Sequence, residues 1–238
     1  MVERALLMIA DISGYTQYMR LHRMSLAHSQ EITGRLLEAM VHATPQLDLI
    51  EIEGDAAFLY ALVDDDDEPV AHASEVALTM HQAFHAQQDR MIGLNMCSCP
   101  GCIEAGRLRV KVVAHVGEIA KQKVKRRTQL VGVDVIAVHR MLKNSVPIEE
   151  YVLMTEPIYW QSAATVQGSA IQLEDELEGL GRTTLYYVDL HSIGLEPLPP
   201  PKPTLIKRLR VTAGVVCRAM PKMLGKQVPH ESAENLNA

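Results

Sequence analysis

The chain has 238 residues, of which 47% are hydrophobic and 22% charged, and its formal net charge is -6. This composition is typical of a globular protein with a full core, and it excludes a disordered chain. The acidic balance excludes nucleic-acid binding through a broad basic face. No apolar run approaches the roughly 20 residues that span a bilayer, and the N-terminal apolar run is too short for a secretory signal. We therefore expect a cytoplasmic protein.

The first half of the chain predicts a strand, a helix and a β-hairpin. An apolar run with one charge at each end predicts a buried strand, and a polar turn follows it, in which Ser13 or Thr16 is available as a helix cap. Apolar residues at helical spacing then predict a helix, and two short strands flank the turn Gly54-Asp55. The predicted ranges are strand 4–11, turn 12–16, helix 25–41, and strands 47–52 and 56–63.

The second half predicts two more helices among strands. Together the elements predict an α+β sandwich, with helices on one face of a mostly antiparallel sheet. The predicted ranges are helix 69–88, strand 108–119, helix 132–143, and strands 151–154, 171–177 and 183–190.

The C-terminal part of the chain has a different character. Five prolines in residues 197–203 predict a stiff linker. Seven basic residues and no acidic one follow Glu196 before Glu231. We divide the chain into a domain over 1–194, a linker over 195–203 and a basic tail over 204–238. The tail fits docking on the acidic domain, disorder, or contact with an anionic membrane surface, and the helix-breaking Gly214 and Pro221 favour the first two.

Two aspartates stand where chemistry is expected. Asp11 ends the first predicted strand, and Asp55 lies at the tip of the hairpin. If the two strands are neighbours, both carboxylates project from one edge and can share Mg²⁺ or Mn²⁺, which prefer oxygen ligands. The backbone N–H groups of the turn 12–16 would suit phosphates. Taken alone, each aspartate also fits an ordinary turn or cap position.

Four segments resemble the class III adenylyl/guanylyl cyclases, in that family's order and with about its spacing. The segments are Ile9 to Thr16 and Glu53 to Ala56, which resemble the two metal motifs, Val113 to Glu118, which resembles the following strand, and Gly132 to Met141, which resembles the helix with a catalytic arginine. They span roughly residues 4–190, and a cysteine cluster before the fourth strand resembles an uncharacterised bacterial branch of the superfamily.

The resemblance implies a ferredoxin-like cyclase sandwich that forms a homodimer with its sites at the interface. A purine nucleoside triphosphate, GTP or ATP, would give the 3′,5′-cyclic monophosphate and pyrophosphate, in signalling. Two metal ions would activate the nucleophile and neutralise charge. The residues implied are Asp11, Ile12 and Asp55 for metal, Ser13, Gly14, Tyr15 and Thr16 for substrate, Arg140 for the transition state, and Glu51 and Gln129 for the base.

The base-reading pair does not settle the nucleotide. A glutamate such as Glu51 can accept hydrogen bonds from guanine N1–H and N2–H, and adenine offers no such pair. The amide of Gln129 can both donate and accept, so it fits either purine. Guanine is therefore weakly favoured, although Glu51 also fits an exposed strand position.

Other positions depart from the cyclase pattern. Ile136 stands where the family places a ribose-orienting asparagine, and Glu118 and Glu178 stand where phosphate-binding cations are usual. A basic segment, Lys121 to Arg127, could substitute for the lost cations or be a solvated loop. A degenerate cyclase fold that binds a nucleotide or a partner without turnover is therefore the alternative function.

Three cysteines, Cys97, Cys99 and Cys102, lie within six residues. The spacing of Cys99 and Cys102 fits a zinc site, whose fourth ligand could be a histidine, Cys217 or a group of the partner subunit. A redox pair and chance clustering are the other interpretations. His115 is expected to pack within its strand and not to bind metal.

Overall fold

The computed structural model describes residues 2–21, 26–64, 67–94 and 103–192. The cysteine cluster at 97–102, the proline-rich linker and the basic tail lie outside these described residues, so the predictions made for them stay predictions. Among the described helices, none is long and apolar enough to cross a membrane.

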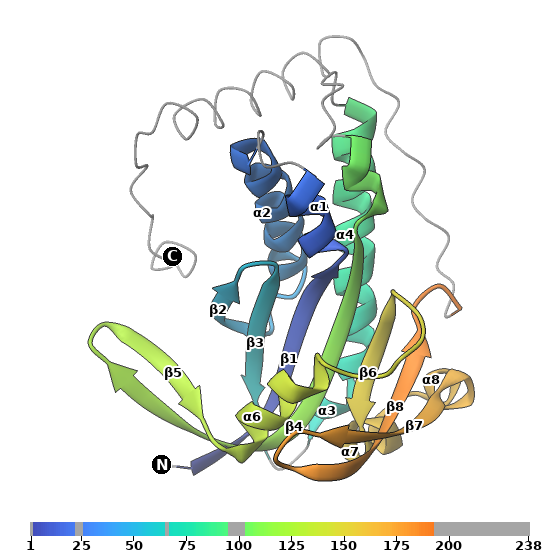
Figure 1. Ribbon diagram of the computed structural model, residues 1–238. Coiled ribbons are helices and arrows are strands. Elements are labelled where there is room, and N and C mark those ends of the chain that lie inside the picture. The colour runs from blue at the N-terminus through green and yellow to red at the C-terminus, as the bar shows by residue number, and fades with distance from the viewer. Residues whose placement is uncertain (1, 22–25, 65–66, 95–102, 193–238) are drawn as a thin grey trace.

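The centre of the fold is an eight-stranded sheet with the order β2-β3-β1-β4-β6-β8-β7, and β5 pairs with β4 beside this path (Figure 1). All neighbours are antiparallel except β4 and β6, which are parallel. The strands are β1 (Val2–Ser13), β2 (Asp48–Glu53), β3 (Ala56–Leu62), β4 (Arg109–Val124), β5 (Arg127–Val131), β6 (Tyr151–Thr155), β7 (Ile171–Leu177) and β8 (Gly181–Asp189).

Helices cover both faces of this sheet. Because side chains alternate along a strand, β1 sends Leu6 and Met8 into a core with α2 and α4, and sends Leu7 and Ile9 to the opposite face, where α6 packs. The helices are α1 (Tyr15–Leu21), α2 (Leu26–His42), α3 (Glu68–Ala71), α4 (Ala73–Leu94), α6 (Val133–Met141), α7 (Glu156–Gln161) and α8 (Ala164–Ser169), with a 3₁₀ turn, η2, at Ala105–Arg107. The α+β sandwich is confirmed, but the prediction of a single helical face is wrong.

Local differences from the predicted elements have identifiable causes. The helix predicted over 69–88 is interrupted at His72, between α3 and α4. The segment predicted as a basic loop is instead a β-hairpin, because β4 continues to Val124 and β5 returns along it. Its alternating charges face solvent on both sides, so no hydrophobic pattern marks them as strand. Two short helices, α7 and α8, were not predicted.

Candidate functional site

The two aspartates meet at one edge of the sheet. Strands β1 and β3 are neighbours, with Asp11 opposite Ala56, so Asp55 lies beside the end of β1. The backbone N–H of Ile12 donates to the carbonyl of Asp55 at 3.1 Å, which ties the hairpin turn to β1. Gly54 has a φ of 64°, a left-handed conformation that glycine adopts without strain, and this permits the tight turn. The condition set for a shared site, that the two strands are neighbours, is therefore met.

The charges at this edge are only partly balanced. Burial, and next the charge of Asp11, raise the pKa of Asp55 to about 6, although its own backbone and Lys111 act in the opposite direction. Lys111 on β4 lies opposite Asp11, and its Nζ is 3.2 Å from Asp11 Oδ2 and 3.4 Å from the carbonyl oxygen of Leu142. Two carboxylates thus share one nearby lysine, which leaves an excess negative charge at this edge.

The turn after β1 lies against the same edge. The hydroxyl of Ser13 donates to the carbonyl of Glu149 at 3.2 Å, which ties the turn to the segment before β6. Gly14 and Thr16 are exposed. Burial and the charge of Asp55 raise the pKa of the Tyr15 hydroxyl, so Tyr15 lies near that carboxylate. A surface cavity of about 360 Å³ lies beside the turn, lined in part by Ser13, Gly14, Arg107 and Arg109.

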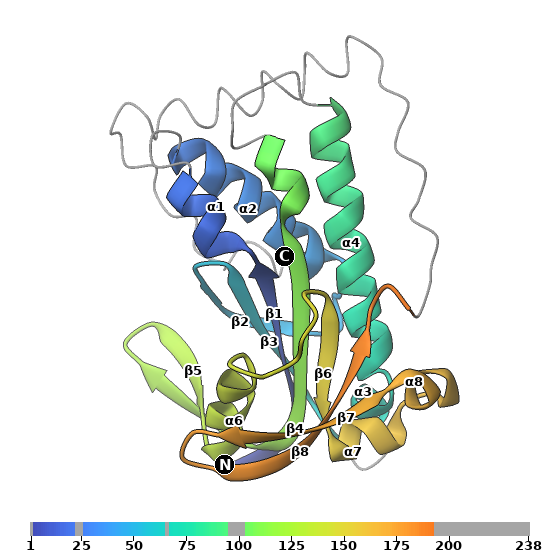
Figure 2. The same cartoon turned by 45° about the vertical axis from the view of Figure 1, so that its right-hand side comes forward.

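The two base-reading candidates occupy contacting elements. Glu51 is half-buried on β2, beside a bulge in its pairing with β3. Gln129 is exposed on β5, paired with Gln122 of β4. The β4–β5 hairpin extends outward from the sheet, as Figures 1 and 2 show, and β5 contacts β2. Gln129 is therefore presented at the surface of the protomer.

The catalytic-arginine candidate is engaged elsewhere. Arg140 on α6 forms an ion pair with Glu178, in the turn between β7 and β8. Ile136, on the same helix, is 51% exposed. Arg140 is thus not directed at the two aspartates within this protomer. Its ion-pair partner, Glu178, is one of the residues that depart from the cyclase pattern.

The third departure, Glu118, belongs to a network around Asp134. The Asp134 carboxylate accepts from the backbone N–H of Glu118 at 2.7 Å and lies 2.9 Å from Nε2 of His115. His115 also contacts the hydroxyl of Thr155 at 3.2 Å. His115 therefore ties β4 to α6 and β6, which agrees with the packing role expected for it.

The donor set at the two aspartates suits a hard divalent cation. Carboxylate and carbonyl oxygens are the ligands that Mg²⁺ and Mn²⁺ take, and Asp11, Asp55 and the carbonyl of Ile12 could supply them. The repulsion that raises the pKa of Asp55 is what a cation would relieve. Lys111 competes with an ion for Asp11.

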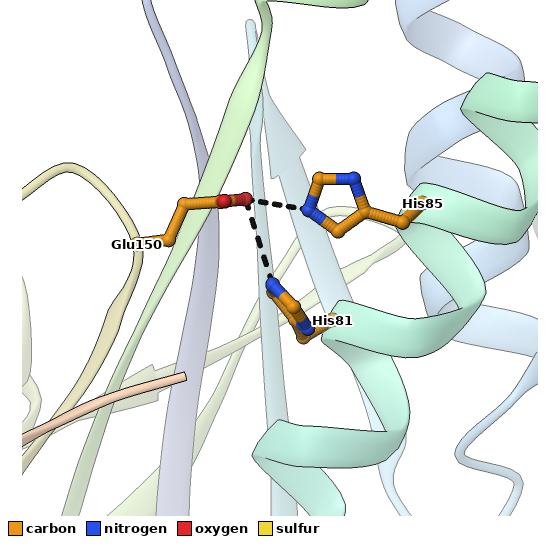
Figure 3. Close-up of side chains that lie close together, drawn as sticks. All are labelled: His81, His85 and Glu150. Atoms are coloured by element: carbon orange, nitrogen blue, oxygen red, sulfur yellow. Dashed lines mark hydrogen bonds and ion pairs between the residues drawn. The ribbon is translucent and has the colours of Figure 1, made fainter. Parts of the chain in front are cut away.

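A second cluster was not predicted from the sequence. His81 and His85 on α4 and Glu150, just before β6, lie with their side chains directed at one another (Figure 3). Burial raises the pKa of the Glu150 carboxyl, but the contacts with His81 and His85 more than offset this and lower that pKa well below its usual range. The signal in the sequence was the pair of histidines four residues apart on a helix, which places both on one face.

Comparisons with known proteins place the chain in a family. Residues 33–151 match the family described as "Protein of unknown function (DUF2652)". The chain is 38% identical over 170 residues to "Uncharacterized protein Rv2561/Rv2562" of Mycobacterium tuberculosis (strain ATCC 25618 / H37Rv), a match that covers 70% of this chain and 77% of that protein.

Solved structures share the fold at low sequence identity. The adenylyl cyclase CyaB from P. aeruginosa matches with a TM-score of 0.58 and 12% identity, over 84% of this chain and 98% of that one. The guanylate cyclase domain of RhGC from Catenaria anguillulae, in complex with GTP, matches with a TM-score of 0.56 and 16% identity, over 78% and 96%. The chain therefore belongs to the DUF2652 family and has the class III adenylyl/guanylyl cyclase fold.

Proposed function

We propose that this chain is a metal-dependent nucleotidyl cyclase that converts a purine nucleoside triphosphate to the 3′,5′-cyclic monophosphate and pyrophosphate. The observation that carries the proposal is the juxtaposition of Asp11 and Asp55, which β1–β3 pairing and the Ile12 to Asp55 hydrogen bond fix at one sheet edge. Two carboxylates held at one edge, with one lysine against Asp11 and excess negative charge, favour binding of a divalent cation.

In this proposal each residue has a limited task. Asp11, Asp55 and the Ile12 carbonyl would hold Mg²⁺ or Mn²⁺, which when bound would lower the pKa of the ribose hydroxyl and neutralise phosphate charge. Ser13, Gly14, Tyr15 and Thr16 form the turn beside which the phosphates would lie. Arg140 would stabilise charge on the α-phosphate after leaving Glu178, and because that ion pair is largely exposed, breaking it costs at most about 1 kcal/mol.

A homodimer would complete the site. Large apolar side chains are exposed on β2, on the β4–β5 hairpin and at the start of α6, elements that follow or contact one another. An exposed apolar surface of this kind is typical of an interface between subunits. The residues are Ile52, Val124, Val131, Val133 and Ile136. Burial of Ile136 by the partner would also explain why an apolar residue is accepted at that position.

The base is proposed to be guanine. Glu51 is half-buried, so a hydrogen bond from guanine N1–H or N2–H to its carboxylate would be partly shielded from water. Gln129 lies exposed on the neighbouring β5 and could contact either purine.

Binding without turnover is the second candidate, and two contacts favour it. Glu178 engages the arginine that the cyclase resemblance assigns to the transition state, and the Lys111 ammonium contacts Asp11, a proposed metal ligand. A module of this kind would still bind a triphosphate, but it would lack groups that stabilise the transition state. Loss of one such group costs about 2.7–4 kcal/mol in other enzymes.

The test is an assay for product with the full-length chain. The protein is incubated with each of the four nucleoside triphosphates and Mn²⁺, and cyclic monophosphate and pyrophosphate are identified by mass. The matched variants are Asp55→Asn, which removes the proposed ligand, and Asp48→Asn, which removes an exposed carboxylate at the other end of the same hairpin. The cyclase proposal expects product from GTP, loss of product in Asp55→Asn, and wild-type product in Asp48→Asn.

Two outcomes contradict the cyclase proposal. If the protein binds a triphosphate but forms no product from any of the four nucleotides, the result supports the binding module. Product that is equal in wild type and Asp55→Asn shows that the two aspartates are not the site of the reaction.

A further inference from the structure

The cluster around Glu150 joins three distant parts of the chain. His81 and His85 lie one turn apart on α4, Glu150 precedes β6, and His191 follows β8. Glu150 is 2% exposed, and its Oε1 lies 2.6 Å from His85 Nε2 and 3.6 Å from His81 Nε2. Three imidazole rings thus surround one buried carboxylate.

The orientation of His85 is fixed by the protein. The side-chain amide nitrogen of Gln88 donates to the carbonyls of Ala105 and Leu108, at 2.8 and 2.9 Å, so the amide oxygen of Gln88 faces the other way. That oxygen lies 3.1 Å from His85 Nδ1. Because an amide oxygen only accepts hydrogen bonds, Nδ1 must carry the proton. A neutral His85 therefore presents the lone pair of Nε2 to Glu150.

A lone pair facing a carboxylate oxygen at 2.6 Å is repulsive, and the gap admits a proton but not a metal ion, so the two groups would have to move apart to about 3.3 Å to share one ion. Metal-binding histidines show this arrangement, in which one ring nitrogen binds the ion and the other donates to a protein acceptor. His85, with Gln88 behind it, therefore has the second contact that a metal ligand requires.

Two further atoms of the cluster lack hydrogen-bond partners. Among the described residues, buried His81 Nε2 and Glu150 Oε2 accept and donate no hydrogen bond. His191 Nε2 is 2.5 Å from Glu150 Oε2, but the contact is not aligned as a hydrogen bond. Buried polar atoms are almost always paired, so two such atoms directed at one point suggest that an ion belongs there.

We infer that His81, His85 and Glu150 bind a divalent transition-metal ion, with Zn²⁺ the best match, and that His191 is the fourth ligand. The ligand atoms of the first three residues lie within 4.8 Å of one another, so small rotations bring them around one ion. Two imidazole nitrogens and one carboxylate are a zinc donor set, and Mg²⁺ prefers oxygen alone. His191 is 65% exposed and would close the fourth position from the solvent side.

The neighbouring cation does not fill this position. Arg109 Nε is 3.7 Å from Glu150 Oε2, beyond hydrogen-bond range, and its Nη1 donates to the carbonyls of Gly106 and Leu108. The backbone N–H of Val110 donates to Glu150 Oε1 at 3.3 Å and holds the carboxylate in place. The bound ion would therefore fasten the end of β8 and the start of β6 to α4.

The experiment measures Zn²⁺ affinity of the full-length chain with all four cysteines replaced by serine, so that thiols cannot bind the ion. Metal-free protein is titrated with Zn²⁺ against a chromophoric chelator, and Co²⁺ is added to a second sample for its absorption spectrum. We expect one Zn²⁺ per chain. Affinity should fall more than about tenfold in His85→Gln and Glu150→Gln, and less in His191→Gln. His72→Gln, at an exposed histidine before α4, is the control and should match the parent.

Circular dichroism establishes that each variant is folded. If His85→Gln and Glu150→Gln are both unfolded, the Co²⁺ spectrum of the parent decides, because tetrahedral nitrogen and oxygen ligands give strong visible bands without thiolate charge transfer. Failure of the folded four-serine chain to bind Zn²⁺ or Co²⁺ overturns the inference. Undiminished binding by folded Glu150→Gln also overturns it.

Discussion

The molecule holds two carboxylate clusters whose surroundings have opposite effects. At the Asp11–Asp55 edge, burial and a second carboxylate raise the pKa of Asp55 to about 6. At the Glu150 cluster, burial also raises the pKa of the carboxyl, but histidines surround it and the pKa is lowered overall. The first cluster has one lysine beside its two carboxylates, and the second has nitrogen donors.

This difference indicates which ion each cluster would select. Carboxylates and a backbone carbonyl suit Mg²⁺ or Mn²⁺, which exchange readily and accompany phosphates. Imidazoles with one buried carboxylate suit Zn²⁺, which often has a structural role. The first cluster lies beside an exposed turn and a surface cavity, and the second lies between helix and sheet. We therefore expect two metal sites, one that binds the triphosphate and one that stabilises the fold.

The largest expected effect separates the two clusters. Asp55→Asn should lower turnover of GTP by roughly a hundredfold or more and leave zinc content unchanged. In the chain whose four cysteines are replaced by serine, Glu150→Gln should lose zinc and keep cyclase activity in the folded protein. Product analysis by mass and metal analysis of the same samples measure both. Loss of turnover in a folded, zinc-free Glu150→Gln would show that the clusters are not independent.

The next effect concerns stability of the metal-free protein against pH. Because the folded pKa of Asp55 is raised from 3.8 to about 6, the folded state holds a proton that the unfolded state releases between these values. Wild type should therefore lose stability relative to Asp55→Asn as pH rises from about 4 to about 6, by about 1–2 kcal/mol after allowance for solvent screening. Urea unfolding in the presence of a chelator measures this, with Asp48→Asn as the control. A difference that is independent of pH contradicts it.

A smaller effect is expected at Lys111. Its ammonium lies 3.2 Å from Asp11 Oδ2 and repels an incoming cation. Lys111→Met should raise Mn²⁺ affinity about threefold to tenfold, and Lys123→Met, further along the same strand, should not. Mn²⁺ titration without nucleotide measures the effect. Weaker Mn²⁺ binding in Lys111→Met would mean that the lysine orients Asp11 for the ion.

The smallest effect is expected at the Arg140–Glu178 pair. Glu178→Gln frees the arginine, and because exposed ion pairs contribute at most about 1 kcal/mol, triphosphate affinity should rise no more than about fivefold. Glu176→Gln, exposed on β7, is the control. Reduced triphosphate affinity in Glu178→Gln alone would place Glu178, and not Arg140, among the groups that favour binding.

Much of the fold could be predicted because its signals are local. The apolar run that forms β1 and the turn at Gly54 mark the strand and the hairpin that bring Asp11 and Asp55 together. The β4–β5 hairpin could not be predicted, because its exposed charged strands lack an apolar face. Helix α6 was predicted, but its place on the second face was not, since a helix pattern does not say which side of a sheet it covers.

Site residues could be predicted only where a local sequence motif contains them, as it does for Asp11 and Asp55. His85 and Glu150 are 65 positions apart in the sequence. The spacing of the two histidines on α4 indicates that they share a helix face, but nothing in the sequence indicates that Glu150 lies beside them. The ion pairs of Lys111 and Arg140 could not be predicted either. The first depends on the register between β1 and β4, and the second on the position of the turn between β7 and β8, and tertiary packing fixes both.

Equilibrium dialysis of GTP tests the central claim most directly. The full-length chain is compared with Asp55→Asn and Asp48→Asn, each with Mn²⁺ and with a chelator. We predict that wild type and Asp48→Asn retain GTP only with Mn²⁺, and that Asp55→Asn retains none. Equal retention by wild type and Asp55→Asn, or retention that does not depend on Mn²⁺, would contradict a metal-dependent triphosphate site at Asp11 and Asp55.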